Sequence, residues 1–195
     1  YFHEYAISRA DVTFNLGTNE MQIHRNESEP WSVTLVETGQ DSMTGGRIKR
    51  AAKYVKGDTF LCTYGDGVSN VDITATIEFH RKHGKEATVT AVQPPGRFGA
   101  FSLQADQTLV DSFMEKPQGD GAWINGGFFV LDRKVLDRIH GDDSVFEQEP
   151  MRSLSADGQL HAWRHTGFWQ PMDTLRDKHV LEELWASGKA PWKSW

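Results

Sequence analysis

One carboxylate lies between two glycines directly after a short apolar run. The run covers Phe60 to Tyr64, and the segment Gly65-Asp66-Gly67 follows it. An apolar run without polar alternation is typical of a strand buried on both faces, as in a parallel sheet. Residues Ser69 to Gly84 then read as a helix, with Asp72 or Asn70 as the N-cap.

Strand, Gly-Asp-Gly and helix together would place Asp66 in the crevice at the carboxyl edge of a sheet, where open α/β folds bind ligands. A tight turn that uses the two glycines for its backbone angles is the alternative. A second acidic residue, Asp173, falls in the glycine- and proline-bearing corner Gly167 to Thr174. There the alternative is an N-cap before the helix that we expect from Leu175 to Ala186.

Two other segments carry polar groups beside glycines. Thr44-Gly45-Gly46 precedes a basic helical stretch that begins at Arg47. At a helix start these residues would offer free backbone N–H groups to an anion, and an ordinary loop-to-helix junction is the alternative. Asn125-Gly126-Gly127 opens a strand that ends at Leu131, where glycines permit close approach by a ligand or another strand. Asn125 alone could be a turn residue.

A third polar pair precedes a proline. Lys116 before Pro117 is restricted to an extended conformation, so Glu115 and Lys116 should point to opposite sides. One of them can then face the carboxyl edge of the sheet, and a solvated surface pair of little energetic value is the alternative. By contrast, the histidine pairs have no third metal ligand in sequence, and Cys62 is most simply a small buried strand residue.

The elements that must position these residues alternate between strands and helices. Further strands are expected at 12–14, 21–24, 32–36, 87–92, 101–103, 108–114 and 160–165, and further helices at 133–139 and 145–156. This order predicts an α/β layer with an antiparallel excursion in the middle.

Composition narrows the class of protein. With 195 residues and 22.0 kDa, the chain can bury one sizeable core and is most economically a single domain. A net charge of -6 argues against a nucleic-acid surface. The longest apolar runs are too short to span a bilayer, and a single cysteine excludes an internal disulfide. A cytoplasmic protein without nucleic-acid or membrane partners is the natural expectation.

Five motifs occur in the order of a known family. They are Tyr-Gly-Asp-Gly at 64–67, Pro-Pro-Gly-Arg-Phe-Gly at 94–99, Phe-Met-Glu-Lys-Pro at 113–117, Ile-Asn-Gly-Gly-Phe-Phe-Val at 124–130 and Gly-Phe-Trp-Gln-Pro-Met-Asp-Thr at 167–174. From about Asp11 onward the chain resembles the sugar-1-phosphate nucleotidyltransferases. Thr44 to Arg47, Pro94 to Gly99 and Gly188 to Lys193 favour the cytidylyl branch over its uridylyl and thymidylyl relatives.

The resemblance implies a Rossmann-like mixed, mainly parallel sheet flanked by helices, the nucleotide-diphospho-sugar transferase fold, in one domain over residues 1–195. Family members open with a first strand and a Gly-Gly-x-Gly-Thr-Arg loop that cradles the triphosphate. This sequence contains no such loop. We therefore expect an N-terminally incomplete domain that keeps the product site, with turnover dependent on an upstream segment.

The implied reaction is attack by the phosphate of glucose 1-phosphate on the α-phosphorus of CTP, which gives CDP-glucose and pyrophosphate. Positioning and charge neutralisation dominate such a step. By resemblance, Asp66 and Asp173 bind Mg2+ and are catalytic together with Lys116, which contacts the sugar phosphate. The implied substrate-binding residues are Thr44, Gly45, Gly46, Arg47, Gly65, Gly99, Glu115, Lys116, Asn125 and Gly126.

Within that set, Glu115, Asn125 and the Gly99 backbone would hold the hexose, while Thr44, Gly45 and Gly46 would line the nucleotide side near the base. Arg47 would assist with phosphate or remain a surface cation of its helix. The resemblance also implies a homo-oligomer, with a hexamer as one arrangement, and a product used for surface-polysaccharide synthesis such as O-antigen. Uridylyl or thymidylyl transfer, and a binding module without turnover, are the alternatives.

Overall fold

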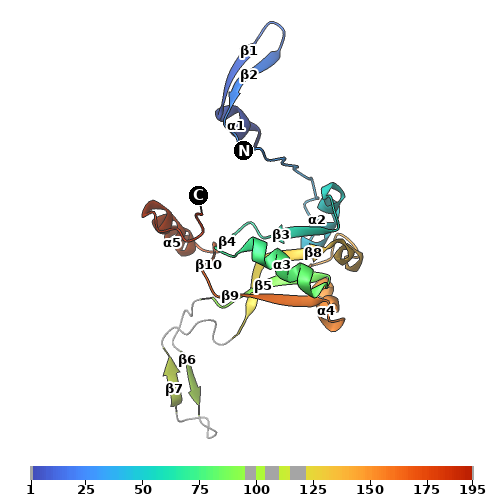
Figure 1. The fold of residues 1–195 in the computed structure, drawn as a ribbon, viewed down its shortest axis with the longest axis vertical. Helices are drawn as coiled ribbons and strands as arrows, with labels where there is room; N and C mark the ends of the chain where they lie inside the picture. The colour runs from blue at the N-terminus through green and yellow to red at the C-terminus, as the bar shows by residue number, and fades with distance from the viewer. Residues whose placement is uncertain (1, 95–99, 104–109, 115–121, 195) are drawn as a thin grey trace. The chain divides into compact units, whose positions relative to one another are not determined.

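The computed structural model describes residues 2–94, 100–103, 110–114 and 122–194 (Figure 1). Their contacts define two compact units, Tyr1–Glu37 and Thr38–Trp195. The single domain that we expect over residues 1–195 stays a prediction. Among the described residues, no helix is long and apolar enough to cross a bilayer.

The first unit is a helix followed by an antiparallel hairpin. It contains α1 (Phe2–Ser8), β1 (Ala10–Asn15) and β2 (Glu20–Asn26). The Asn15 side chain accepts hydrogen bonds from the N–H groups of Gly17 and Thr18 at 3.0 and 3.2 Å, which stabilises the turn. The two strand pieces expected here are therefore confirmed.

The strand expected at 32–36 is wrong. Residues 31–39 form neither helix nor strand, and Leu35 is 76% exposed. β-Branched residues favour an extended chain, but a strand also needs a partner that takes up its backbone hydrogen bonds, and none pairs with this segment in the described residues.

The second unit is organised around a four-stranded sheet of order β3-β8-β5-β9. Its strands are β3 (Thr59–Thr63), β5 (Ala87–Val92), β8 (Ile124–Asp132) and β9 (Leu160–His165). β8 runs antiparallel to both of its neighbours, and β5 runs parallel to β9. Three of the four strands therefore share one direction, although two of the three pairings are antiparallel. The expected mixed sheet with helices is confirmed.

The second unit also contains further helices and short strands (Figure 1). They are α2 (Thr44–Ala51), η1 (Ala52–Tyr54), β4 (Gly67–Ser69), α3 (Ile73–His83), β6 (Ala100–Leu103), β7 (Val110–Met114), η3 (Arg133–Arg138), α4 (Glu149–Ala156), β10 (Trp169–Pro171) and α5 (Leu175–Ala186). β6 pairs antiparallel with β7, as expected.

Local signals fix the ends of α3. The Asp72 carboxylate accepts a hydrogen bond from the Ala75 N–H at 2.8 Å, so Asp72 is the N-cap. At the other end Gly84 has a φ of 63°, the left-handed conformation in which glycine stops a helix. Both ends agree with the sequence.

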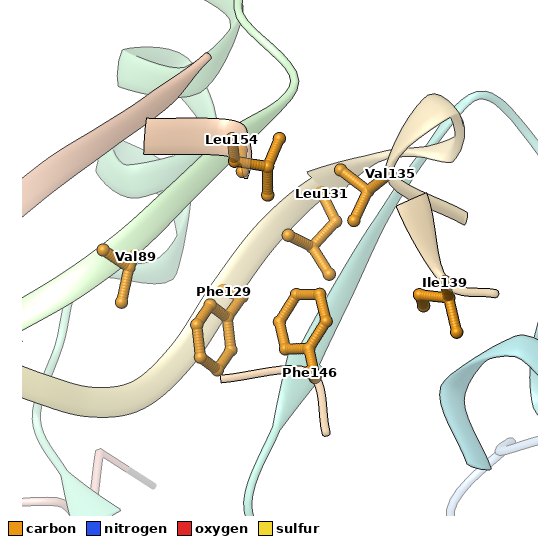
Figure 2. Packing of buried hydrophobic residues seen from close by; sticks show 8 residues of the cluster. Val89, Phe129, Leu131, Val135, Ile139, Phe146 and Leu154 are labelled. Carbon is orange, nitrogen blue, oxygen red and sulfur yellow. The ribbon is translucent and has the colours of Figure 1, made fainter. Parts of the chain in front are cut away.

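The core lies on one face of β8 and β5 and is closed by η3, α4 and the loop before α4. It contains Ala87, Val89, Phe129, Leu131, Val135, Ile139, Phe146 and Leu154. Figure 2 shows the rings of Phe129 and Phe146 close together, with centroids 5.5 Å apart in an edge-to-face arrangement. Burial of such side chains stabilises the fold by about 1.5–3 kcal/mol each, so the loop that carries Phe146 is anchored in the core.

Candidate active site

The sheet topology gathers four chain segments at one edge. Because β3, β5 and β9 share a direction, their carboxyl ends lie at the same edge, and the antiparallel β8 begins there. Asp66 follows β3 and Asn125 lies at the start of β8, opposite Ala91 of β5. Asp66 thus lies at the carboxyl edge, where an α/β sheet binds ligands.

Asp66 and Asp173 are brought together by a short ladder between β4 and β10. These strands pair antiparallel, with Gly67 opposite Pro171, and the Met172 N–H donates to the Asp66 carbonyl oxygen at 2.8 Å. Both aspartates are exposed. We call Asp66 and Asp173, with β4 and β10, the carboxylate corner.

Both structural alternatives for these aspartates are wrong. Neither Gly65 nor Gly67 has a positive φ, so no tight turn demands them, and a Cβ at Gly65 would meet nothing within 4 Å. The N-cap of α5 is Thr174, whose hydroxyl accepts from the Asp177 N–H in a capping box. Asp173 is therefore not engaged as the helix cap.

The carboxylate corner fits the donor set of a magnesium site. Mg2+ prefers oxygen ligands and is usually held by one or two carboxylates together with phosphate oxygens and waters. The corner carries two exposed carboxylates, which are donors of this kind. Among the described residues, no group of three or more His, Cys, Asp or Glu side chains could hold a metal by itself.

The Asn125-Gly126-Gly127 segment requires both glycines. A Cβ at Gly126 would lie 2.9 Å from the Thr90 carbonyl oxygen of β5, and one at Gly127 would lie 2.6 Å from the Tyr64 ring. Gly127 also has a φ of 78°. The expected close approach is therefore made by a neighbouring strand and by Tyr64, and it fixes the position of Asn125.

The start of α2 packs directly on the loop before α4. The N–H groups of Gly45 and Gly46 donate to the Ser144 carbonyl at 2.8 and 3.4 Å. A Cβ at Gly46 would lie 2.6 Å from the Asp142 Cα. These N–H groups are not free for an anion, and the ordinary junction describes this part of the structure.

A hydrogen-bonded group that sequence reasoning missed links Thr44 to Asn125. The two carboxylate oxygens of Glu147 accept from the hydroxyls of Thr44, at 2.7 Å, and Tyr64, at 2.5 Å. Asn125 Nδ2 donates to the Tyr64 hydroxyl oxygen at 3.0 Å. We call these four residues the Glu147 network. Glu147 belongs to none of the motifs, and Tyr64 begins the Tyr-Gly-Asp-Gly motif without a predicted role of its own, so only the folded chain identifies their contacts.

The other predicted residues divide into described and undescribed ones. Arg47 donates to the Thr38 hydroxyl at 2.7 Å and to the Gln40 carbonyl at 3.0 Å, so it holds the segment before α2. Gly99, Glu115 and Lys116 lie outside the described residues, and their roles stay predictions.

The histidines of α3 serve packing. Thr88, which is fully buried, bonds to His80 at 2.9 Å and to His83 at 2.7 Å, and the His83 ring stacks on His161 at 4.3 Å. Burial lowers the pKa of both His80 and His83, that of His83 to about 4. The two rings are therefore neutral near pH 7.

Two further side chains have structural partners at the edge of the sheet. Burial raises the pKa of the Cys62 thiol, and the Glu147 charge adds to this, so Cys62 is a poor nucleophile. The Trp169 indole donates to the Gly126 carbonyl at 2.8 Å and borders a hollow of about 210 Å³ that Val92, Gln93 and residues 165–170 line.

Comparison with known proteins shows which family this chain belongs to. The model of the nucleotidyl transferase family matches residues 14–170. The solved structure of HddC from Yersinia pseudotuberculosis superposes with a TM-score of 0.55 at 25% identity, over 73% of this chain and 62% of that chain. A putative glucose-1-phosphate thymidylyltransferase from Bacillus anthracis has the same fold, with a TM-score of 0.54 at 18% identity over 80% of this chain and 64% of that one. The chain belongs to the nucleotidyl transferase family.

The relatives that are most similar in sequence indicate the branch of this family. The glucose-1-phosphate cytidylyltransferase of Salmonella typhi is 60% identical over the full length of this chain, which spans 76% of that relative. A probable glucose-1-phosphate cytidylyltransferase of Bacillus subtilis is 39% identical over the same shares. The family and the cytidylyl branch that the motifs indicate are therefore confirmed by similarity.

Proposed function

We propose that this protein transfers the cytidylyl group of CTP to glucose 1-phosphate and so forms CDP-glucose and pyrophosphate. The observation that carries the proposal is the carboxylate corner, where the bond from the Met172 N–H to Asp66 sets Asp173 beside Asp66 at the carboxyl edge. The 60% identity to the Salmonella enzyme supports CTP and glucose 1-phosphate as the substrates.

In the proposed reaction a phosphate oxygen of glucose 1-phosphate attacks the α-phosphorus of CTP, and the bond to the pyrophosphate oxygen breaks. Both reactants are anions, so the protein must bring them together and hold them in line. Asn125, fixed by Gly127 and Tyr64, would hold a sugar hydroxyl. The open space beside Gly65 leaves room for substrate atoms next to Asp66.

Asp66 and Asp173 would hold Mg2+, which when bound neutralises phosphate charge. Lys116 would contact the sugar phosphate, Glu115 a sugar hydroxyl, and the Gly99 backbone the hexose. The nucleotide side would be lined by the start of α2 and its ordered junction, which consist of Thr44, Gly45, Gly46 and Arg47. A homo-oligomer, a cytoplasmic location and a product used for surface polysaccharide complete the proposal.

A pyrophosphate-release assay tests the proposed function. CTP, glucose 1-phosphate and Mg2+ are supplied to this chain and, in parallel, to this chain extended at its N-terminus by the glycine-rich segment of a family member. UTP and dTTP replace CTP in matched reactions. We expect pyrophosphate to be released faster with CTP than with UTP or dTTP.

The outcomes separate the branches of the family. Faster release with UTP or dTTP than with CTP would overturn the cytidylyl assignment and leave nucleotidyl transfer in place. Absence of release from both forms with all three nucleotides would overturn the transfer function itself. Release from the extended form alone would support the site and show that the added segment carries groups that turnover needs.

A further inference from the structure

We propose that Tyr64 and Glu147 are positioning residues that orient the Asn125 amide toward the sugar. This inference rests on the proposed function and deepens it, because it names residues that set how the sugar is held. Neither residue needs to touch the substrate. The proposal concerns the Glu147 network, which joins the end of β3, the loop before α4, the start of β8 and the start of α2.

The hydrogen bonds admit one orientation of the Asn125 side chain. The Gly127 N–H can only donate, so the oxygen Oδ1 of Asn125 faces it at 2.9 Å. The nitrogen Nδ2 then faces the Tyr64 hydroxyl at 3.0 Å. That hydroxyl has one hydrogen and donates it to Glu147, so its oxygen is an acceptor for Asn125. A rotated amide would set two donors against each other at Gly127.

This orientation gives the second Nδ2 hydrogen of Asn125 a defined direction. A sugar hydroxyl oxygen that meets this hydrogen must accept the bond. Without the Tyr64 hydroxyl, the amide would keep its bond to Gly127 and lose the partner that holds its nitrogen. Because an ordered amide binds with a smaller loss of conformational entropy, the Tyr64–Glu147 pair should improve binding of the sugar.

The same carboxylate also orders the predicted nucleotide side. Its second oxygen accepts from the Thr44 hydroxyl, and Thr44 Oγ1 in turn accepts from the Phe146 N–H at 2.9 Å. The hydrogen of Thr44 is therefore committed to Glu147. One carboxylate thus holds groups from both sides of the proposed site.

The core makes this arrangement rigid. Phe146 is 1% exposed and precedes Glu147, and its ring packs on Phe129. The Tyr64 ring packs edge-on against the same Phe129, with centroids 5.8 Å apart. Burial and the bond to Glu147 raise the pKa of Tyr64 well above its ordinary value, so the phenol keeps its proton. The donor to Glu147 is present across the neutral pH range.

Titration calorimetry with CDP-glucose and with CDP tests the inference, because the two ligands differ in the sugar. We expect Tyr64→Phe to raise the Kd for CDP-glucose about tenfold, the usual effect of a lost hydrogen bond. The Kd for CDP should stay within about twofold. Glu147→Ala should act like Tyr64→Phe on CDP-glucose.

Two variants serve as controls. Glu147→Gln retains an acceptor for Tyr64 and presents its amide to Thr44 Oγ1, so it should restore binding of CDP-glucose close to that of the wild type. Thr88→Val removes a buried hydroxyl that bonds to His80 and His83, away from the network. It should leave both Kd values unchanged even where thermal unfolding shows a lower Tm.

Each outcome decides the inference. Equal binding of CDP-glucose by the wild type and Tyr64→Phe would overturn it, and so would parallel weakening of CDP and CDP-glucose, which indicates a general structural role. Failure of Glu147→Gln to restore binding would remove Glu147 from the positioning pair. A wild type that binds neither ligand, both as this chain and in the form extended at its N-terminus, would instead overturn the proposed function, and the inference with it.

Discussion

The Glu147 network and the carboxylate corner lie at the same end of the sheet but are built differently. Tyr64 and Phe146, which carry the network, both pack on Phe129 in the core. The carboxylate corner depends on a ladder between two strands of 3 residues each, and both of its aspartates are exposed. A group that must hold a direction benefits from core packing, whereas carboxylates that meet a metal ion and phosphate must stay reachable.

The largest expected effect comes from the shared support of the network. Phe146→Ala should lower the free energy of unfolding by about 4 kcal/mol, because it leaves a cavity against Phe129. Urea denaturation measures this, with Phe14→Ala as control, since Phe14 is 55% exposed and should change stability by less than about 0.5 kcal/mol. A loss below about 1 kcal/mol for Phe146→Ala would mean that the loop before α4 is not anchored in the core.

The next largest effect comes from a glycine substitution at the start of α2, which should cost more stability than a glycine substitution beside Asp66. Gly46→Ala places a Cβ 2.6 Å from the Asp142 Cα, so α2 must move away from the loop, at a cost of about 3 kcal/mol in unfolding free energy. Gly65→Ala, beside Asp66, meets nothing within 4 Å and should cost less than about 0.5 kcal/mol. Similar losses for the two alanine variants would contradict the contrast between a packed network and an open corner.

Removal of a charge at the carboxylate corner should lower activity and leave the free energy of unfolding unchanged. Asp66→Asn and Asp173→Asn should each lower pyrophosphate release about 100-fold in an active form of the protein, because each weakens metal binding and charge neutralisation. Their unfolding free energies should stay within about 0.5 kcal/mol of the wild type. Asp143→Asn changes an exposed carboxylate elsewhere and is the matched control. Full activity of either corner variant would remove that aspartate from the proposed metal site.

The smallest expected effect is the pH dependence of stability that arises from the histidines of α3. Burial lowers the pKa of His83 to about 4, with His161, His80 and Lys85 adding repulsion. The unfolded chain therefore binds more protons than the folded chain below pH 6.5, so stability should fall as pH drops from about 6.5 to 4. Urea denaturation at pH 7 and pH 5 should show a smaller drop for His83→Gln than for the wild type. An equal drop would assign the pH dependence to other groups.

Local signals made much of the fold predictable. The strands β3 and β8, the Asp72 cap and Gly84 stop of α3, and the helix α5 follow from residue types that act over a few neighbours. The expected burial of β3 on both faces is wrong, because β3 is the edge strand of the four-stranded sheet and Leu61 is 56% exposed. The segment 32–36 shows the limit of such signals. Its residues favour an extended chain, but strand formation depends on a partner elsewhere in the fold.

The candidate site was predictable in part. Asp66, Asp173, Asn125 and the glycine segment at 44–46 belong to motifs, so the sequence indicates them. The pairing of β4 with β10 was missed because strands of 3 residues are too short to show a period. Glu147 was missed because its contacts join residues 103 and 83 positions apart in sequence, which only the folded chain brings together.

Titration of CDP-glucose with and without Mg2+ tests the division between the two regions most directly. The wild type, Tyr64→Phe and Asp66→Asn are compared under both conditions. The account predicts that Tyr64→Phe weakens binding by the same factor with and without Mg2+, whereas Asp66→Asn weakens it only when Mg2+ is present. Equal weakening by Asp66→Asn under both conditions, or a Tyr64→Phe defect confined to Mg2+, would contradict the account.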